Sequence, residues 1–197
     1  MRLMQAAERL IAERGVDGVS VRDITAAADT NSASIHYHFQ SKEGLVHALM
    51  EDRAARIRAR RQAHLQRLDD HQPTVREVAE AMVNPTFELV SGKEGETDTA
   101  YVGFLAALLD EPSMVPALER YFSDQYDASF EALQRARPDL PKTSAVNRVC
   151  FALHLVLNSV SEPARGLRTW IERHHQPAVD QIREDLIDFI TGALGAP

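Results

Sequence analysis

A short stretch near the start of the chain combines small residues with longer hydrogen-bond donors, and this combination suits contact with a DNA duplex. Ser32, Ala33 and Ser34 come first, and small side chains let a helix bring its backbone close to the edges of bases. The longer donors that follow are His36, Tyr37, His38 and Lys42. Their N–H and O–H groups can bind phosphate oxygens, so the order predicts base contacts at the start of a helix and phosphate contacts behind it.

These residues need helices to position them, and the preceding sequence predicts two. Apolar residues at helical spacing indicate a first helix that ends at the turn between Gly15 and Gly18. Ser20 and Asp23 have the three-residue spacing of a capping box, which favours a second, short helix beginning at Val21. The DNA-contacting residues follow directly on this pair.

A third helix is predicted over residues 32–39, after the turn-forming sequence DTN at 29–31. Two short helices separated by such a turn form a helix-turn-helix, whose second helix enters the major groove. Ser41 is predicted to cap a fourth, much longer helix, where free backbone amides beside Lys42 also favour a phosphate.

The rest of the chain is also expected to be helical, because the 3.6-residue period recurs and alternating strand patterns are almost absent. Pro85 should bend or interrupt one of these helices. The segment 163–175 is ambiguous between a loop and a short helix. The predicted helices lie near residues 74–90, 97–110, 113–136, 142–161 and 177–194. The predicted fold class is all-α.

The distribution of charge separates the start of the chain from the remainder. The net charge of the whole chain is −7, but residues 1–67 hold 11 Lys and Arg against 8 Asp and Glu, or +3, and residues 68–197 hold 11 against 21, or −10. Charges more than about 8 to 10 Å apart are largely screened at physiological salt, so a basic start can face DNA within an acidic protein.

Neither a membrane segment nor an intramolecular disulfide is expected. The sequence contains no apolar run near the roughly 20 residues that span a bilayer and no secretory signal at its start, which predicts a cytoplasmic protein without a membrane partner. Cys150 is the single cysteine, and its apolar neighbours predict that it is a small core residue.

The sequence around the predicted helix-turn-helix resembles the TetR family of transcriptional regulators. The resemblance covers about residues 6–52 and is carried by the segments AAERLIAERGVDGVSVRDIT and ADTNSASIHYHFQSKEGL. The residues that match the family pattern are Gly15, Ser20, Ile24, Ile35, Tyr37, His38, Phe39, Ser41, Lys42 and Leu45. Asp29 replaces the family's turn glycine, although Asp tolerates the left-handed conformation, and His36 replaces its first tyrosine.

The resemblance implies roles for individual residues. Base contacts are expected from Arg22, Ser32, Ala33 and Ser34, and phosphate contacts from His36, Tyr37, His38 and Lys42. Tyr37 has the alternative of packing half-buried against the first helix, and His38 has that of capping the helix end. The arginine-rich run from Arg53 to Arg61 is interpreted as a solvated face of the long helix rather than as a DNA contact.

The resemblance also implies a domain order and a homodimer. The helix-turn-helix DNA-binding domain is expected at residues 1–45, a connecting helix at 46–67, and a helical effector-binding and dimerisation domain at 68–197. A dimer would place two recognition helices in successive major grooves, about 34 Å apart or a multiple of it, on a palindromic operator of double-stranded DNA. The expected interface residues are Val156, Leu157, Val160, Ile182, Leu186, Phe189 and Ile190.

A small, largely apolar effector is expected to bind the C-terminal domain and to release a repressor from its operator. The aromatic residues that would line the pocket are Phe87, Phe104, Tyr121, Phe122, Tyr126 and Trp170, each with a place in the core as the alternative. His154, Asn158 and Glu162 recur at four-residue spacing and form a polar row, which lies at the end of the pocket, at the dimer interface or at a capped helix end.

Catalysis is not predicted. The sequence has no nucleophile motif, phosphate loop or dinucleotide fingerprint, and His36 and His38 lack the four-residue spacing of a helical metal pair. Neither a metal nor a cofactor is therefore expected. A DNA-binding protein controlled by a protein partner instead of a small molecule is the remaining alternative, which a large exposed apolar patch outside the dimer face would favour.

Overall fold

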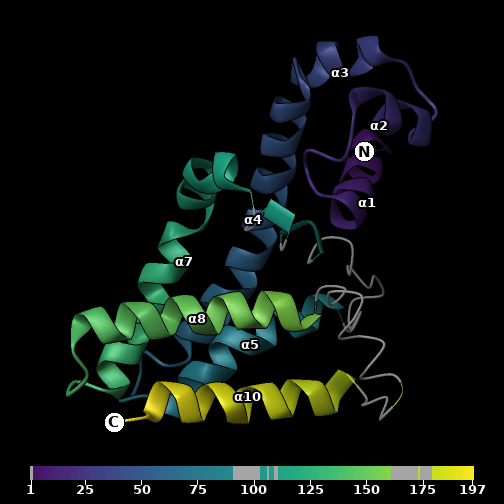
Figure 1. The fold of residues 1–197 in the computed structure, drawn as a ribbon. Coiled ribbons are helices and arrows are strands. Elements are labelled where there is room, and N and C mark those ends of the chain that lie inside the picture. The colour runs from purple at the N-terminus through teal and green to yellow at the C-terminus, as the bar shows by residue number, and fades with distance from the viewer. Residues whose placement is uncertain (1, 91–102, 106, 109–110, 161–172, 174–178) are drawn as a thin grey trace.

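The computed structural model describes residues 2–90, 103–105, 107–108, 111–160, 173 and 179–197 (Figure 1). Every regular element in these residues is a helix, which confirms the predicted all-α fold. The labelled helices are α1 (Arg2–Arg14), α2 (Val21–Ala27), α3 (Ser32–Phe39), α4 (Lys42–Gln66), α5 (Val75–Val90), the 3₁₀ helix η1 (Pro112–Met114), α7 (Val115–Ala136), α8 (Lys142–Val160) and α10 (Val179–Gly195). Among these helices, none has both the length and the apolarity that crossing a membrane requires.

The headpiece, residues 2–41, contains α1, α2 and α3 and lies at one end of α4 (Figure 1). Its predicted capping box is confirmed: the Ser20 hydroxyl accepts from the Asp23 amide at 3.2 Å, and the Asp23 carboxylate accepts from the Ser20 amide at 2.8 Å. These bonds satisfy amides that have no partner within the first turn of α2. Asp29 has a φ of 50°, so the residue in place of the turn glycine does adopt the left-handed conformation.

The turn between α3 and α4 requires glycine at position 44. Ser41 caps α4 by accepting from the Gly44 amide at 3.1 Å, as the sequence predicts. A Cβ atom on residue 44 would lie 2.0 Å from the carbonyl oxygen of Phe39, far inside van der Waals contact. Any side chain there would force the end of α3 away from α4, so Gly44 sets the angle between these two helices.

The lower part of the molecule is arranged around α5, which packs against α4, α7, α8 and α10. Figure 1 shows α8 and α10 running side by side at the end opposite the headpiece. α5 continues from Val75 to Val90, so Pro85 does not interrupt it. Buried Met82 and Phe87 hold the helix in the core on both sides of the proline.

Two clusters of buried side chains form the core, and the first extends beyond the headpiece. It joins the headpiece to α4 and continues into Phe104, Leu105 and Leu108. A Cβ atom on Gly103 would be 3.1 Å from the Cβ atom of Ala12, so the segment 103–105 lies directly against α1. The second cluster lies among α5, α7, α8 and α10. The headpiece is therefore packed against segments that follow α4 as well as against α4 itself.

Cys150 is exposed, and the prediction that it belongs to the core is wrong. α8 buries Val149, Leu153 and Val156, which share one face at helical spacing. Cys150 and the exposed Phe151 lie outside this face. Apolar residues lie on nearly every side of this helix, so the apolar neighbours of Cys150 did not reveal that it faces outward.

A buried ion pair joins α1 to α4. The Arg53 guanidinium donates to the Glu8 carboxylate at 2.7 Å, and the two side chains are 13% and 3% exposed. Arg61, further along α4, is also buried. The prediction that the run from Arg53 to Arg61 is a solvated face is wrong for these two arginines, because α1 and α7 both cover α4. It is right for Arg56, which is 54% exposed.

Replacing Arg53 with methionine is expected to lower the free energy of unfolding by about 3 kcal/mol, because the change takes a cation away from a buried carboxylate. Arg56 is the matched control, since it pairs at 3.5 Å with exposed Asp52 and surface pairs contribute less than about 1 kcal/mol. Urea unfolding followed by circular dichroism measures both variants. Equal losses for Arg53→Met and Arg56→Met would contradict a stabilising role for the buried pair.

Candidate functional site

α3 forms the free end of the headpiece and presents most of its side chains to solvent (Figure 1). The side chain of Asn31 caps the helix by accepting from the Ser34 amide at 3.2 Å. Ile35 is fully buried and anchors α3 in the first core cluster. A helix held on one side by its core residue leaves the opposite side available to enter a groove.

The residues predicted to contact bases lie at the starts of two neighbouring helices. Ser32 and Ala33 are exposed in the first turn of α3, and Arg22 is exposed in the first turn of α2. Ser34 is half-buried, and its hydroxyl lies 2.9 Å from the hydroxyl of Thr30. Ser34 therefore also stabilises the turn before α3, whereas the other three side chains have the accessibility that base contact requires.

Tyr37 and His38 form an exposed aromatic pair. Tyr37 is 84% exposed, so it does not pack half-buried against α1. Its ring meets His38 edge to face, with 4.9 Å between the ring centroids, and His38 lies in turn against Phe39. Both side chains are exposed, so the phenol and the imidazole are accessible to a phosphate.

His36 binds the end of its own helix. Its Nδ1 atom lies 2.9 Å from the carbonyl oxygen of Gln40, which can only accept, so the geometry places a proton on Nδ1. The neutral ring then presents Nε2 as an acceptor, and Nε2 can donate to a phosphate only when the ring carries both protons. The sequence analysis gave capping of the helix end as the alternative role of His38. In the structure, His36 rather than His38 makes the capping contact.

Lys42 binds the backbone of the headpiece. Its ammonium group donates to the carbonyl oxygens of Val16 and Val19 at 3.0 and 3.1 Å. These carbonyls belong to the turn between α1 and α2, so Lys42 holds that turn against the start of α4. One N–H of the ammonium remains for another acceptor, and the predicted phosphate contact would use it.

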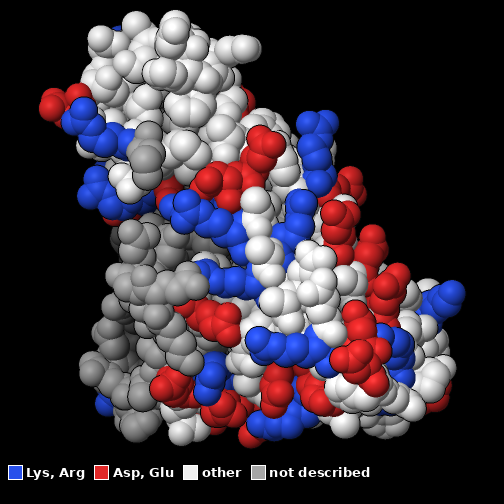
Figure 2. Space-filling view, turned by 180° about the vertical axis from the view of Figure 1, so that it is seen from behind, with Lys and Arg blue, Asp and Glu red and all other residues white. Residues whose placement is uncertain are grey.

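Permanent positive charge is scarce at the free end of the headpiece. α3 contains no lysine or arginine. Figure 2 shows basic side chains gathered below the headpiece, over the middle of that face, and few over its upper end. Phosphate contacts from α3 itself would therefore use the hydrogen-bonding groups of its tyrosine and histidines rather than lysine or arginine.

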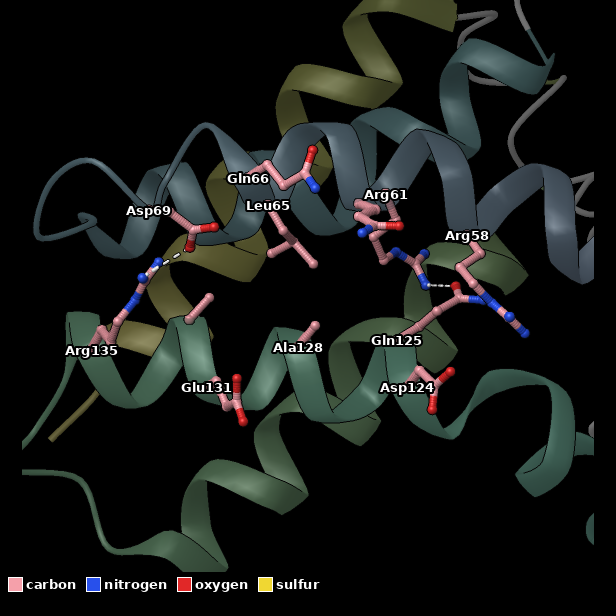
Figure 3. A pocket seen from close by; sticks show the side chains of 12 residues that line it. Arg58, Arg61, Leu65, Gln66, Asp69, Asp124, Gln125, Ala128, Glu131 and Arg135 are labelled. Atoms are coloured by element: carbon pink, nitrogen blue, oxygen red, sulfur yellow. Dashed lines mark hydrogen bonds and ion pairs between the residues drawn. The ribbon is translucent and has the colours of Figure 1, made fainter.

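A cavity of about 420 Å³ lies between α4 and α7 (Figure 3). At one end, the Arg61 guanidinium donates to Oε1 of Gln125 at 2.7 Å. At the other end, the Arg135 guanidinium donates to the Asp69 carboxylate at 3.1 Å. The other lining residues are Arg58, Gln62, Leu65, Gln66, Asp124, Ala128, Glu131 and Ala132. Polar links therefore cross between the two sides at both ends of the cavity.

The aromatic residues predicted to line an effector pocket do not line this cavity. Phe87, Phe104 and Phe122 are buried in the core clusters, which is the alternative that the sequence left open. Tyr121 and Tyr126 are partly buried, and desolvation of its phenol raises the pKa of Tyr126. A pocket formed by these aromatic residues stays a prediction.

The predicted polar row lies on the outer side of α8 where the structure describes it. His154 and Asn158 are exposed, and the Asn158 side chain donates to the carbonyl oxygen of His154 at 3.0 Å. Glu162 and Trp170 lie outside the described residues. The exposed positions of His154 and Asn158 agree better with the dimer-interface alternative than with an enclosed pocket.

α8 and α10 expose apolar side chains at the end of the molecule opposite the headpiece. Phe151 and Phe189 are 72% and 66% exposed, and Val146 is 48% exposed. Gly192, one turn after Phe189, is also exposed, and a Cβ atom placed on it would have no neighbour within 4 Å among the described residues. Glycine within a helix costs about 1 kcal/mol relative to alanine, and none of the described residues requires it here. A second helix approaching closely would require it.

The residues predicted for a dimer interface have different environments in the single chain. Those buried in the chain's own core are Val156, Leu186 and Ile190. Leu157 and Ile182 are half-buried, Phe189 is exposed, and the side chain of Val160 lies outside what the structure describes. Phe189 is thus the predicted residue best placed to meet a partner.

Sequence patterns did not identify the arginines and the glutamine of the cavity as functional residues. Arg61 follows buried Ile57 by four residues and therefore lies on the buried stripe of α4. Gln125 lies in the same way on the buried stripe of α7, between Phe122 and Ser129. A polar residue on an apolar stripe needs a partner or a ligand, and this is the signal that would have found both.

Two parts of the chain match known protein families. Residues 3–49 match the family described as bacterial regulatory proteins, tetR family, and residues 80–193 match the tetracyclin repressor-like C-terminal domain. The chain is 23% identical over 197 residues to the HTH-type transcriptional repressor KstR2 of Rhodococcus jostii, an alignment covering 99% of this chain and 90% of the relative. KstR2 of Mycolicibacterium smegmatis is 40% identical over 50 residues, which are 25% of this chain and 24% of the relative.

Solved structures of regulators share the fold. AibR in complex with isovaleryl coenzyme A and operator DNA aligns with a TM-score of 0.67 at 18% identity, covering 95% of each chain. The ketosteroid transcriptional regulator KstR2 of Mycobacterium tuberculosis aligns with a TM-score of 0.65 at 22% identity, covering 96% of this chain and 91% of that chain.

Arg22 and Lys42 are expected to affect DNA binding in different ways. Arg22→Ala should relax the preference at one base pair by about 1 to 3 kcal/mol, because an exposed guanidinium can read a base edge. Lys42→Met should weaken binding to all DNA sequences alike and lower the melting temperature of the protein, because the Lys42 ammonium binds the headpiece backbone. Binding to a set of operators with single-base changes measures the difference. A sequence-dependent effect of Lys42→Met with a uniform effect of Arg22→Ala would contradict this division.

Proposed function

Because the chain belongs to the TetR family of bacterial regulatory proteins, we propose that it is a repressor of transcription that binds a palindromic operator as a homodimer and leaves it when a small effector binds. The observation that carries the proposal is α3, a capped helix at a free end with one fully buried anchor, Ile35. In the proposal, residues 1–45 bind DNA and residues 68–197 bind the effector and dimerise. Residues 46–67 form the helix that connects these two domains.

DNA recognition is assigned to the starts of α2 and α3. The exposed positions of Arg22, Ser32 and Ala33 support contact with base edges in the major groove. The Tyr37–His38 pair and His36 are assigned to the phosphates on either side of the groove. Because one headpiece reads only a few base pairs, two headpieces on one operator are needed for specificity.

Dimerisation is assigned to the outer face of α8 and α10. Phe151 and Phe189 supply exposed apolar area, and Gly192 leaves room for a close helix. His154 lies exposed on the same helix as Phe151. A two-fold arrangement of this face would form a four-helix interface with the headpieces at the other end of each chain.

Control by a small molecule is assigned to the cavity beside α4. AibR, which has the same fold, is known in complex with isovaleryl coenzyme A and operator DNA, and this supports a small effector for the present chain. An effector that moves α4 would move α3, because Gly44 and Lys42 fix the headpiece to the start of that helix. Release by a factor of one hundred requires only about 2.7 kcal/mol of coupling.

Control by a protein partner has less support. Two of the exposed large apolar residues in the described chain, Val115 and Tyr37, lie apart from α8 and α10, and they are far from each other in the sequence. A partner-binding patch requires a contiguous apolar area of several hundred Å². The cavity between α4 and α7 favours a small molecule instead.

Selection of genomic DNA fragments by the purified protein tests the proposed function. The expected result is enrichment of one palindromic sequence, and transcription in vitro from a promoter that contains it should fall when the protein is added. Failure to enrich any sequence would refute DNA recognition. An increase in transcription would refute the repressor assignment while leaving DNA recognition intact.

A charge on the apolar face should separate the subunits. Phe151→Glu with Phe189→Glu is expected to give a monomer at micromolar concentration and to lower operator affinity, because the apolar contact and the paired headpieces are both lost. Val115→Glu is the control, since Val115 is 49% exposed at the start of α7 and lies outside this face. Sedimentation velocity measures the mass, and a dimer that survives the double substitution would place the interface elsewhere.

A further inference from the structure

The cavity between α4 and α7 has a cationic end (Figure 3). Arg58 and Arg61 reach it from α4, and Gln125 reaches it from α7. Arg61 is 4% exposed and Gln125 is 3% exposed, so two of the three polar side chains are almost wholly removed from water. Burial of positive charge is unfavourable unless negative charge or several acceptors lie close to it.

The groups at this end are predominantly donors. Oε1 of Gln125 already accepts from Arg61, which leaves Nε2 of the amide as a donor, and this atom is buried with no hydrogen-bond partner among the described residues. Arg58 donates through Nη2 to the carbonyl oxygen of Tyr121 at 3.0 Å, while its Nε atom is buried without a partner in the described chain. A buried donor without an acceptor is unfavourable, so an acceptor placed here would relieve that cost.

The carboxylates that line the cavity do not neutralise Arg58. Asp69 is at the far end, bound to Arg135. Asp124 and Glu131 are exposed on α7, and within the described residues neither forms an ion pair with Arg58. Among the described residues, Arg58 therefore has no carboxylate partner, and Nε2 of Gln125 is an additional donor at this end.

Apolar side chains line part of the cavity between its two ends, beside the exposed Gln62, Gln66 and Glu131. Leu65 extends from α4 between the two helices, and Ala128 lies opposite on α7 (Figure 3). Ala132, one turn further along α7, is 3% exposed and also lines the cavity. The volume of about 420 Å³ lies within the range of small-molecule sites. A molecule that fits this arrangement has one charged end and an apolar body.

We infer that the cavity binds a small organic anion whose carboxylate or phosphate group is held by Arg58, Arg61 and Gln125. Its apolar part lies along Leu65, Ala128 and Ala132. The inference rests on the proposed function, because this anion is the effector of the proposed repressor. It changes the expected effector from a largely apolar compound to an amphipathic one with an oxyanion.

The position of the site connects the ligand to the DNA-binding end. Arg58 and Arg61 lie on α4, and Gln125 lies on α7, so an oxyanion bound to all three bridges these helices. Such a bridge changes how α4 sits against α7. The start of α4 carries the headpiece through Gly44 and Lys42, so this change is transmitted to α3.

Calorimetric titration of the full chain with octanoate, octyl phosphate and 1-octanol tests the site. At least one of the two anions should bind. The affinity for 1-octanol should be at least about tenfold lower, because 1-octanol lacks the negative charge that the guanidinium groups bind. Arg58→Gln should weaken anion binding by about tenfold. Arg56→Gln, an exposed arginine of the same helix that pairs with Asp52, is the control and should change binding less than twofold.

Arg58→Lys keeps the positive charge and should bind anions more tightly than Arg58→Gln. Circular dichroism checks that both variants are folded. Equal binding of octanoate and 1-octanol, no binding of either anion, or equal effects of Arg58→Gln and Arg56→Gln would each overturn the site. Operator binding by the ligand-free protein is measured separately. If the protein binds the anion but the ligand-free protein binds no operator, the proposed function is refuted and the anion site is not.

Discussion

Helix α4 contacts both the headpiece and the cavity, so its position affects the geometry of both. Its first turn is joined to α3 through Gly44 and to the turn between α1 and α2 through Lys42, and Arg53 then binds Glu8 in the core beside α1. Its second half forms one wall of the cavity. Because close-packed interiors transmit displacement instead of absorbing it, a shift at one end of this helix reaches the other.

The arginines of α4 differ in role because successive residues of a helix face different neighbours. Arg53 faces α1, Arg56 faces solvent, and Arg61 faces α7. Apolar side chains stay in contact when one helix shifts slightly along another. The hydrogen bonds of a guanidinium form only at a few relative positions of the two helices. The polar links of α4 therefore restrict how the headpiece and α7 can be arranged around it.

Local patterns were enough to predict the helices of the headpiece, the Ser20–Asp23 capping box and the left-handed Asp29, because these depend on residues a few positions apart. The contacts of Lys42 with Val16 and of Arg61 with Gln125 join residues 26 and 64 positions apart, and no local pattern encodes them. The exposure of Cys150 and Phe151 on α8 was equally hidden in sequence, since apolar residues lie on nearly every side of that helix and its packing against α5, α7 and α10 selects the buried face.

The absence of lysine and arginine from α3 bears on how the proposed regulator would search for its operator. Attraction to random duplex is almost entirely a matter of cations neutralising phosphates, and chromosomes offer about 10⁶ to 10⁹ competing positions. A reading helix without permanent cations adds little to that attraction. In the proposed function, more of the protein would then stay unattached between encounters with its operator, where an effector can reach it.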